Sequence, residues 1–285
     1  MTMKNVSMSL SSWEAEYKTP SRGRVLPRER VLPRWVIFNI QLGLVVCLLA
    51  VWELGTRMGW IDPFFWSAPS AIFSTGLIFI QQGDAFVDTW FTFRSTLLGF
   101  VFGTLGGAAI GLSFWWSRNY SAICEPFILV FHAIPKLALG PLVILVFGMG
   151  LASKVAMAMA LTIVVSILNT YSGVQSVDGD LVRLMYSLGA KRLDVFTKVV
   201  IPSTMPWIIS SLRVNIGLAL AGAIVGEFIS SQYGLGRKIL YAGSTYDIAL
   251  IWVATIVLSI LAMLMYIAVV RLEKLLLKGI MHKRV

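Results

Sequence analysis

The sequence has few of the residues on which soluble enzymes depend. Only 13% of its 285 residues are charged, whereas a soluble globular domain carries about 25%. It has two histidines, His132 and His282, and two cysteines, Cys47 and Cys124. These few potential ligands have no zinc-type or disulfide-framework spacing. The phosphate-binding pattern G-x-x-x-x-G-K-[S/T] is also absent, so we expect no catalytic residue, no metal site, no cofactor and no ATP hydrolysis in this chain.

Long apolar runs take the place of the missing charge. Apolar residues make up 57% of the chain, and its mean hydropathy is +0.80. A membrane-spanning helix needs about 20 mostly apolar residues, so we predict an all-α membrane protein with about six spans. The expected spans are residues 35–56, 92–114, 124–149, 154–175, 203–226 and 248–270. They form a transmembrane domain, 35–276, between a basic arm, 1–34, and a tail, 277–285.

The positive charge has an uneven distribution. The net charge is +10, and with the N-terminus inside, 17 of the 24 lysines and arginines lie on the cytoplasmic side and five outside. Basic residues favour the cytoplasmic loops of membrane proteins. We therefore expect both termini in the cytoplasm, contact with lipid, and no nucleic-acid partner.

The one sizeable cytoplasmic loop between spans, residues 178–202, has clear helix signals. Asp178 and Asp180 are typical N-caps, and Gly189 is placed to end a short helix. A second segment begins at Lys191, and we expect Pro202 to end it. Apolar side chains gather on one side of each segment: Leu181, Val182, Leu184, Met185 and Leu188, then Leu193, Phe196, Val199 and Val200. This apolar surface needs a cover, either the protein's own helix ends or a partner.

The same loop resembles the cytoplasmic signature of permease subunits of binding-protein-dependent ABC importers. That signature reads Glu-Ala-Ala, three residues, Gly, nine residues, Ile, one residue, Leu-Pro. Four positions match its later part at the required spacing: Gly189, Val199, Ile201 and Pro202. The start differs, because Arg183, Leu184 and Met185 replace Glu-Ala-Ala. That replacement removes the acid of the signature but keeps the helix–glycine–helix arrangement.

The resemblance covers roughly residues 60 to 275. Over this range the sequence is similar to the nitrate, taurine and alkanesulfonate branch of the family. It rests on the following positions: Pro126, Ile134, Pro135, Leu137, Ala138, Pro141, Leu142, Phe147, Gly148, Gly150, Gly189, Ala190, Leu212, Arg213, Gly226, Glu227, Gly234, Leu235 and Gly236. Each piece is weak alone, and together they are specific to the branch. The arm before residue 35 is not covered.

The resemblance implies a transmembrane subunit of the type I importer architecture in a bacterial cytoplasmic (inner) membrane. It implies a homodimer, two ATP-binding cassette ATPase subunits that bind the ATP, and an extracytoplasmic solute-binding protein. Loop 178–202 would then seat in a groove of the ATPase and switch the spans between outward and inward access. The residues expected to couple to the ATPase are Asp180, Leu181, Leu184, Met185, Leu188, Gly189, Ala190 and Pro202.

A few polar residues lie within the expected spans, where charge is costly. Lys136 follows Pro135, and it could attract an anionic solute or cap nearby backbone carbonyls. With His132 and Asn215 it forms our candidate translocation path. For Arg213 we expect snorkelling or a tie to another helix. The acids near the outer ends of spans, Glu53 and Glu227, are expected to be wet.

Glycines recur every fourth residue in the second span, at Gly99, Gly103, Gly107 and Gly111. Gly222 and Gly226 repeat the spacing in the fifth span. Small residues on one helix face allow close helix packing in membranes. The ridge predicts either a static helix contact or a sliding or dimer surface.

Two other functions stay open. One is a scaffold that couples ATPases to a membrane vitamin-binding protein, although its Ala-Arg-Gly motifs are absent. The other is a stand-alone secondary carrier or channel, in which six spans form one half. Within the importer reading, the solute is a small anion of the nitrate, sulfonate or taurine class.

Overall fold

The computed structural model describes residues 33–282 of the chain. The chain divides within the first long helix, so that residues up to Val51 form one unit and Trp52 onward another. The expected arm, 1–34, lies outside the described residues except for its last two positions. The final three residues of the expected tail lie outside them as well.

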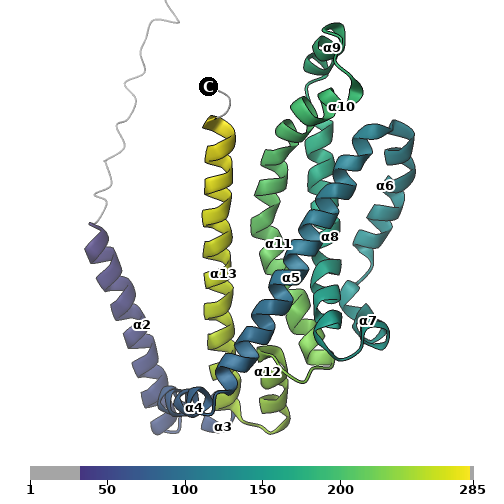
Figure 1. Ribbon diagram of the computed structural model, residues 1–285. Helices are drawn as coiled ribbons and strands as arrows, with labels where there is room; N and C mark the ends of the chain where they lie inside the picture. The colour runs from purple at the N-terminus through teal and green to yellow at the C-terminus, as the bar shows by residue number, and fades with distance from the viewer. Residues whose placement is uncertain (1–32, 283–285) are drawn as a thin grey trace, which may run out of the picture. The chain divides into compact units, whose positions relative to one another are not determined.

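Every regular element of the described residues is helical (Figure 1). The elements are α2 (Arg34–Arg57), α3 (Pro63–Trp66), α4 (Pro69–Gln81), α5 (Asp84–Ser113), the 3-10 turn η1 (Phe114–Trp116), α6 (Arg118–Ala133), the 3-10 turn η2 (Lys136–Leu139), α7 (Gly140–Phe147), α8 (Leu151–Gln175), α9 (Gly179–Ser187), α10 (Arg192–Val195), the π-helical turn η3 (Phe196–Val200), α11 (Ile201–Ile229), α12 (Leu235–Ser244) and α13 (Ile248–His282).

The helices confirm an all-α protein with about six candidate spans. Five continuous stretches of the described residues are long and apolar enough to cross a bilayer. They are Trp35–Arg57, Asp84–Trp116, Leu151–Gln175, Arg192–Ile229 and Ile248–Lys278. A bent pair, Arg118–Ala133 with Lys136–Phe147, makes a sixth if it is one span.

The bend of that pair is 80° and lies at Pro135. Ile134, the residue before this proline, is extended, with φ −61° and ψ 131°. A residue before proline avoids the helical region, and proline itself offers no N–H to the preceding turn. The expected span 124–149 is therefore two helices that meet at a corner.

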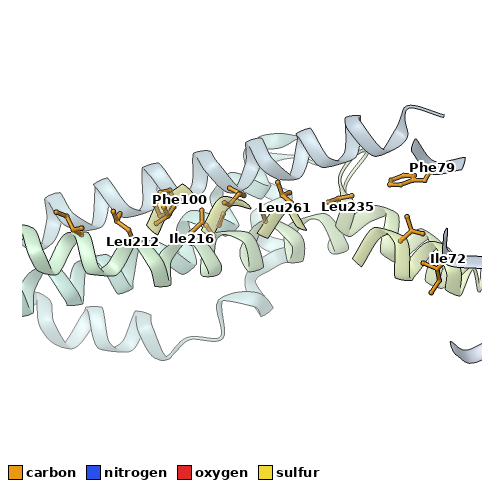
Figure 2. Close-up of a cluster of buried hydrophobic side chains, with 14 residues drawn as sticks. Ile72, Phe79, Phe100, Leu212, Ile216, Leu235 and Leu261 are labelled. Atoms are coloured by element: carbon orange, nitrogen blue, oxygen red, sulfur yellow. The ribbon is translucent and has the colours of Figure 1, made fainter. Parts of the chain in front are cut away.

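Helices α5, α8 and α11 pack against one another at the centre of the unit that begins at Trp52. A seam of buried apolar side chains continues from these helices to α13, α12 and α4. Figure 2 shows seven of its members: Ile72, Phe79, Phe100, Leu212, Ile216, Leu235 and Leu261. This seam holds the outer parts of the bundle to the central helices.

Within this unit, the loops gather at two opposite ends of the bundle. Helices α9 and α10 lie at the end where α13 finishes (Figure 1). Helices α4 and α12 lie at the other end (Figure 1). We call the first, which holds residues 178–202, the elbow end, and the second the α12 end.

Candidate functional site

The first half of the helix–glycine–helix of residues 178–202, here called the elbow, forms as its end signals indicate. The Asp178 carboxylate accepts a hydrogen bond from the Asp180 backbone N–H at 2.8 Å, which caps α9. At the other end of α9, Gly189 adopts φ +81°. A side chain is strained in this left-handed region, so glycine is what lets the chain turn from α9 into α10.

The apolar face of α9 is uncovered. None of its residues is buried, and Leu181, Leu184 and Leu188 are 47%, 54% and 74% exposed. Met185 and Ala190 are half-buried. A groove of about 670 Å³ opens between α9, the turn η1, α6 and the end of α8, and Val182 is among its lining residues. Among the described residues, α9 is therefore not packed back on the helix ends of its own chain.

The second half of the elbow departs from the expected pattern. Pro202 does not end a helix, because it lies in the first turn of α11, which runs on to Ile229. The preceding π-helical turn explains this, since the Ile201 N–H bonds to the Phe196 carbonyl five residues earlier. Proline is tolerated in a first helical turn, where no donor is required. The expected apolar face also differs, because Val195 and Val200 are buried while Leu193 is 61% exposed.

The candidate translocation residues do not meet at one place. Lys136 is 8% exposed, and its ammonium donates to the His132 carbonyl at 3.0 Å. It also lies 5.9 Å from the centre of the Phe131 ring. This is the carbonyl-capping arrangement, and the His132 side chain itself is exposed. The pair belongs to the corner between α6 and α7.

Asn215 lies elsewhere, fully buried where α5, α8 and α11 meet. Its amide nitrogen donates to Thr104 Oγ1 at 3.1 Å and to Ser166 Oγ at 2.6 Å. Its carbonyl oxygen has no partner among the described residues. The residue thus joins three helices through side-chain hydrogen bonds.

The glycine ridge of α5 lies against α8. The nearest atoms to a side chain at Gly99, Gly103 and Gly111 would belong to Ala158, Thr162 and Thr170. Gly222 of α11 also lies against Ala158, because a Cβ atom at Gly222 would be 2.7 Å from the Ala158 Cα. Because α8 already occupies the ridge, the ridge is not a free dimer surface.

A buried polar cluster at the α12 end was not anticipated. Glu227 is 1% exposed, so the expectation that it is wet is wrong. Its carboxylate accepts from Thr92 Oγ1 at 2.9 Å and from the Gly236 N–H at 2.8 Å. Asp88, which is 3% exposed, accepts from the Gly234 N–H at 2.8 Å. These bonds tie the loop between α11 and α12 to α5.

Two lysines complete this cluster, which we call the outer knot: Asp88, Thr92, Lys154, Glu227, Gly234, Gly236 and Lys238. Lys154 is fully buried. Its ammonium donates to the carbonyls of Met149 and Ser230, the first at 2.7 Å. Lys238 pairs with Asp84 at 2.6 Å and lies 3.6 Å from Asp88.

One sequence signal could have revealed the outer knot. Gly234 adopts φ +116°, and a Cβ atom on Gly236 would lie 3.0 Å from Glu227 Oε2. Two glycines so close after an acid indicate a backbone folded onto a carboxylate. The partner residues on α5 could not be read in this way, because they lie more than 130 positions earlier in the chain.

Two other charged residues join separate helices. The Arg213 guanidinium pairs with Glu273, and its Nη2 lies 2.9 Å from Glu273 Oε1. This is an interhelical tie between α11 and α13. Glu53 of α2 is partly covered, since its carboxylate accepts from the backbone N–H and the hydroxyl of Ser70 at the start of α4.

The part of the chain that the structure describes contains no group of three or more His, Cys, Asp or Glu side chains that could hold a metal ion. The distinctive features of the arrangement are an uncovered elbow, a closely packed three-helix centre and a buried outer knot.

Comparison with known proteins identifies the relatives. A family profile described as binding-protein-dependent transport system inner membrane component matches residues 95–282. The riboflavin transport system permease protein RibX of Chloroflexus aurantiacus is 30% identical over 257 residues, which cover 90% of this chain and 96% of RibX. The taurine transport system permease protein TauC of Escherichia coli is 26% identical over 258 residues, covering 87% and 94%.

Among solved structures, a chain of the MetNI methionine ABC transporter in an inward-facing conformation has a similar fold. The TM-score is 0.58 at 17% sequence identity, over 66% of this chain and 93% of that chain.

Proposed function

This chain belongs to the binding-protein-dependent transport system inner membrane component family and is a multi-pass inner-membrane permease of an ABC importer, and we propose that its elbow seats a separate ATPase subunit. The observation that carries this proposal is the uncovered apolar face of α9. Leu181, Leu184 and Leu188 are all exposed in the described chain. Exposed contiguous apolar side chains mark sites where another protein binds.

The charges at the elbow end support its placement in the cytoplasm. Basic residues outnumber acidic ones there, and cytoplasmic loops carry such an excess. They are Arg118, Arg183, Lys191, Arg192, Lys198, Arg271, Lys274 and Lys278. With this orientation, the α12 end faces the outside and receives the solute-binding protein. Two copies of the chain form the pore, and ATPase closure moves their elbows.

The solute in this proposal is small and carries an anionic group, such as the sulfonate of taurine, the solute in the name of the relative TauC. Lys136 is the residue of the candidate path whose charge suits an anion. An ammonium has three donors, and the contact with His132 accounts for one of them. The relationship to RibX supports a second candidate, a riboflavin-like heteroaromatic solute. Titration of the cognate binding protein with taurine and with riboflavin separates the two.

Transport in proteoliposomes tests the proposal. The permease is reconstituted with its ATPase chain and its binding protein, and uptake of labelled solute is followed with and without ATP. We expect uptake only when both partners and ATP are present. Uptake by the permease alone, without ATP, would instead identify a stand-alone carrier. Binding of solute by an integral membrane partner instead of a soluble protein would identify the scaffold type.

A further inference from the structure

An aromatic cluster joins the elbow to the neighbouring turn at the same end of the bundle. The turn η1, between α5 and α6, consists of Phe114, Trp115 and Trp116. The Phe196 ring lies 5.4 Å from Trp115 and 5.3 Å from Trp116, centre to centre. Rings at such separations attract one another beyond simple burial. The elbow is therefore held at its second half and not along α9.

Arg192 closes this cluster. Its guanidinium carbon lies 5.5 Å from the centre of the Trp115 ring and 5.1 Å from that of Trp116. It also donates a hydrogen bond to the Trp116 carbonyl. Tryptophan faces are the best aromatic partners for a cation, and arginine can stack on a ring and donate at the same time. We call Arg192, Trp115, Trp116 and Phe196 the clamp.

On its other side, η1 is anchored to the membrane helices. Phe114 is 4% exposed, and its ring lies 5.2 Å from both Tyr120 of α6 and Tyr171 of α8. The turn follows α5 directly along the chain. A movement that reaches η1 through the clamp thus acts on three helices at once.

The clamp lies next to a π-helical turn. The turn Phe196–Val200 lies between α10 and α11, and its backbone hydrogen bond joins residues five apart instead of four. Such turns are frequent where helices change shape in function. Arg192 begins the continuous helical stretch Arg192–Ile229, which contains this turn and α11, so the clamp connects η1 to a helix that can adjust at the turn.

We propose that Arg192, seated on Trp115 and Trp116, is a positioning residue that transmits movement of the elbow to α5, α6 and α8 during transport. This inference rests on the proposed docking of an ATPase at α9. It assigns the clamp no contact with ATP or solute. Arg192 acts through the tryptophans, so its removal loosens the elbow without uncovering or changing the apolar face of α9.

The test uses the complete transporter in proteoliposomes and three readouts. These are solute imported per ATP hydrolysed, ATP hydrolysis stimulated by the binding protein, and the yield of a crosslink between Leu188→Cys and the ATPase. The variants are Arg192→Ala and the double change Trp115→Ala with Trp116→Ala. Lys198→Ala is the matched control, because Lys198 is a cation of the same elbow that is 66% exposed and pairs only with Asp194 among the described residues.

We expect the two clamp variants to keep the crosslink yield and the ATP hydrolysis but to import about threefold less solute per ATP, as for the loss of a modest cation–ring contact. Trp115→Phe with Trp116→Phe, which keeps the rings, should restore most of the ratio. Lys198→Ala should leave the amount of solute imported per ATP unchanged.

The inference is overturned if Arg192→Ala imports as much solute per ATP as the wild type. It is also overturned if Arg192→Ala loses crosslink yield, which would make Arg192 part of the docking surface. Absence of the crosslink in the otherwise unaltered transporter overturns the proposed docking itself.

Discussion

The two ends of the bundle differ in which side chains they bury and which they expose. At the α12 end, charged residues are buried and find their partners within the same chain, as Glu227 does with Thr92 and Gly236. At the elbow end, apolar residues such as Leu188 are exposed, and the described chain offers them no cover. Buried charge needs satisfied partners, and an exposed apolar surface marks contact with another protein or with lipid. The outer knot thus finds its partners within this chain, whereas the elbow, in the function proposed above, is half of an interface.

The largest effect is expected from breaking the outer knot with Glu227→Ala. This change leaves the Thr92 hydroxyl and the Gly236 N–H without their acceptor. Two buried donors at about 1–3 kcal/mol each predict a loss of about 3 kcal/mol or more in the free energy of unfolding. Thermal denaturation in detergent measures it. Asp180→Ala at the elbow end, where the side chain is 88% exposed, is the control. Equal melting temperatures would show that the knot adds no stability.

The next effect concerns the helices between the two ends. A methyl group on Gly107 would meet the Ile163 carbonyl and Ser166, whereas one on Gly106 would have only Ile163 Cδ1 at 3.8 Å. Overpacking costs about 1–3 kcal/mol, so Gly107→Ala should destabilise the protein and Gly106→Ala should not. The same denaturation assay compares the two neighbours. If both variants melt alike, α5 and α8 are not in the close contact described.

A smaller and local effect is expected at the elbow from Gly189→Ala. The residue has φ +81° with open space around it. A left-handed backbone costs an alanine about 1 kcal/mol, so amide hydrogen exchange within α9 should speed up about fivefold by local opening. Gly179→Ala, in the first turn of the same helix, has equal space and no positive φ. Similar exchange in the two variants would mean that the turn does not require glycine.

The smallest change in stability, with the largest change in function, is expected from Leu184→Asp combined with Leu188→Asp. Both side chains are exposed, so the free energy of unfolding should change by about 0.5 kcal/mol or less. ATP-driven uptake should nevertheless be lost, because the apolar face no longer fits its partner. Leu184→Met with Leu188→Met keeps the face apolar and should transport. Normal uptake by the aspartate variant would remove the elbow from the mechanism.

The sequence alone predicted the features that depend on neighbouring residues. The spans follow from long uncharged runs, and the start and end of α9 follow from Asp178 and Gly189. Each of these signals acts within a few positions of the chain. The corner at Pro135 has an equally local cause, although residues 124–149 were predicted as one span.

The features that depend on distant residues could not be predicted. Glu227 was expected to be wet because it lies near the end of its span, and only the packing of α5 and the α11–α12 loop buries it. Pro202 was assigned to a helix end, since a proline usually stops a helix, but the π-helical turn before it accommodates the missing donor. The exposure of α9 likewise depends on which helix ends reach it.

A site-specific crosslink tests the central claim most directly. In a variant with Cys47→Ser and Cys124→Ser, one cysteine replaces Leu188 at the elbow or Tyr246, which is 70% exposed after α12. The assembled transporter is treated with a short bifunctional reagent. The account predicts that Leu188→Cys joins the ATPase chain and that Tyr246→Cys does not. A cysteine at position 188 that reaches only its own polypeptide or lipid would contradict it.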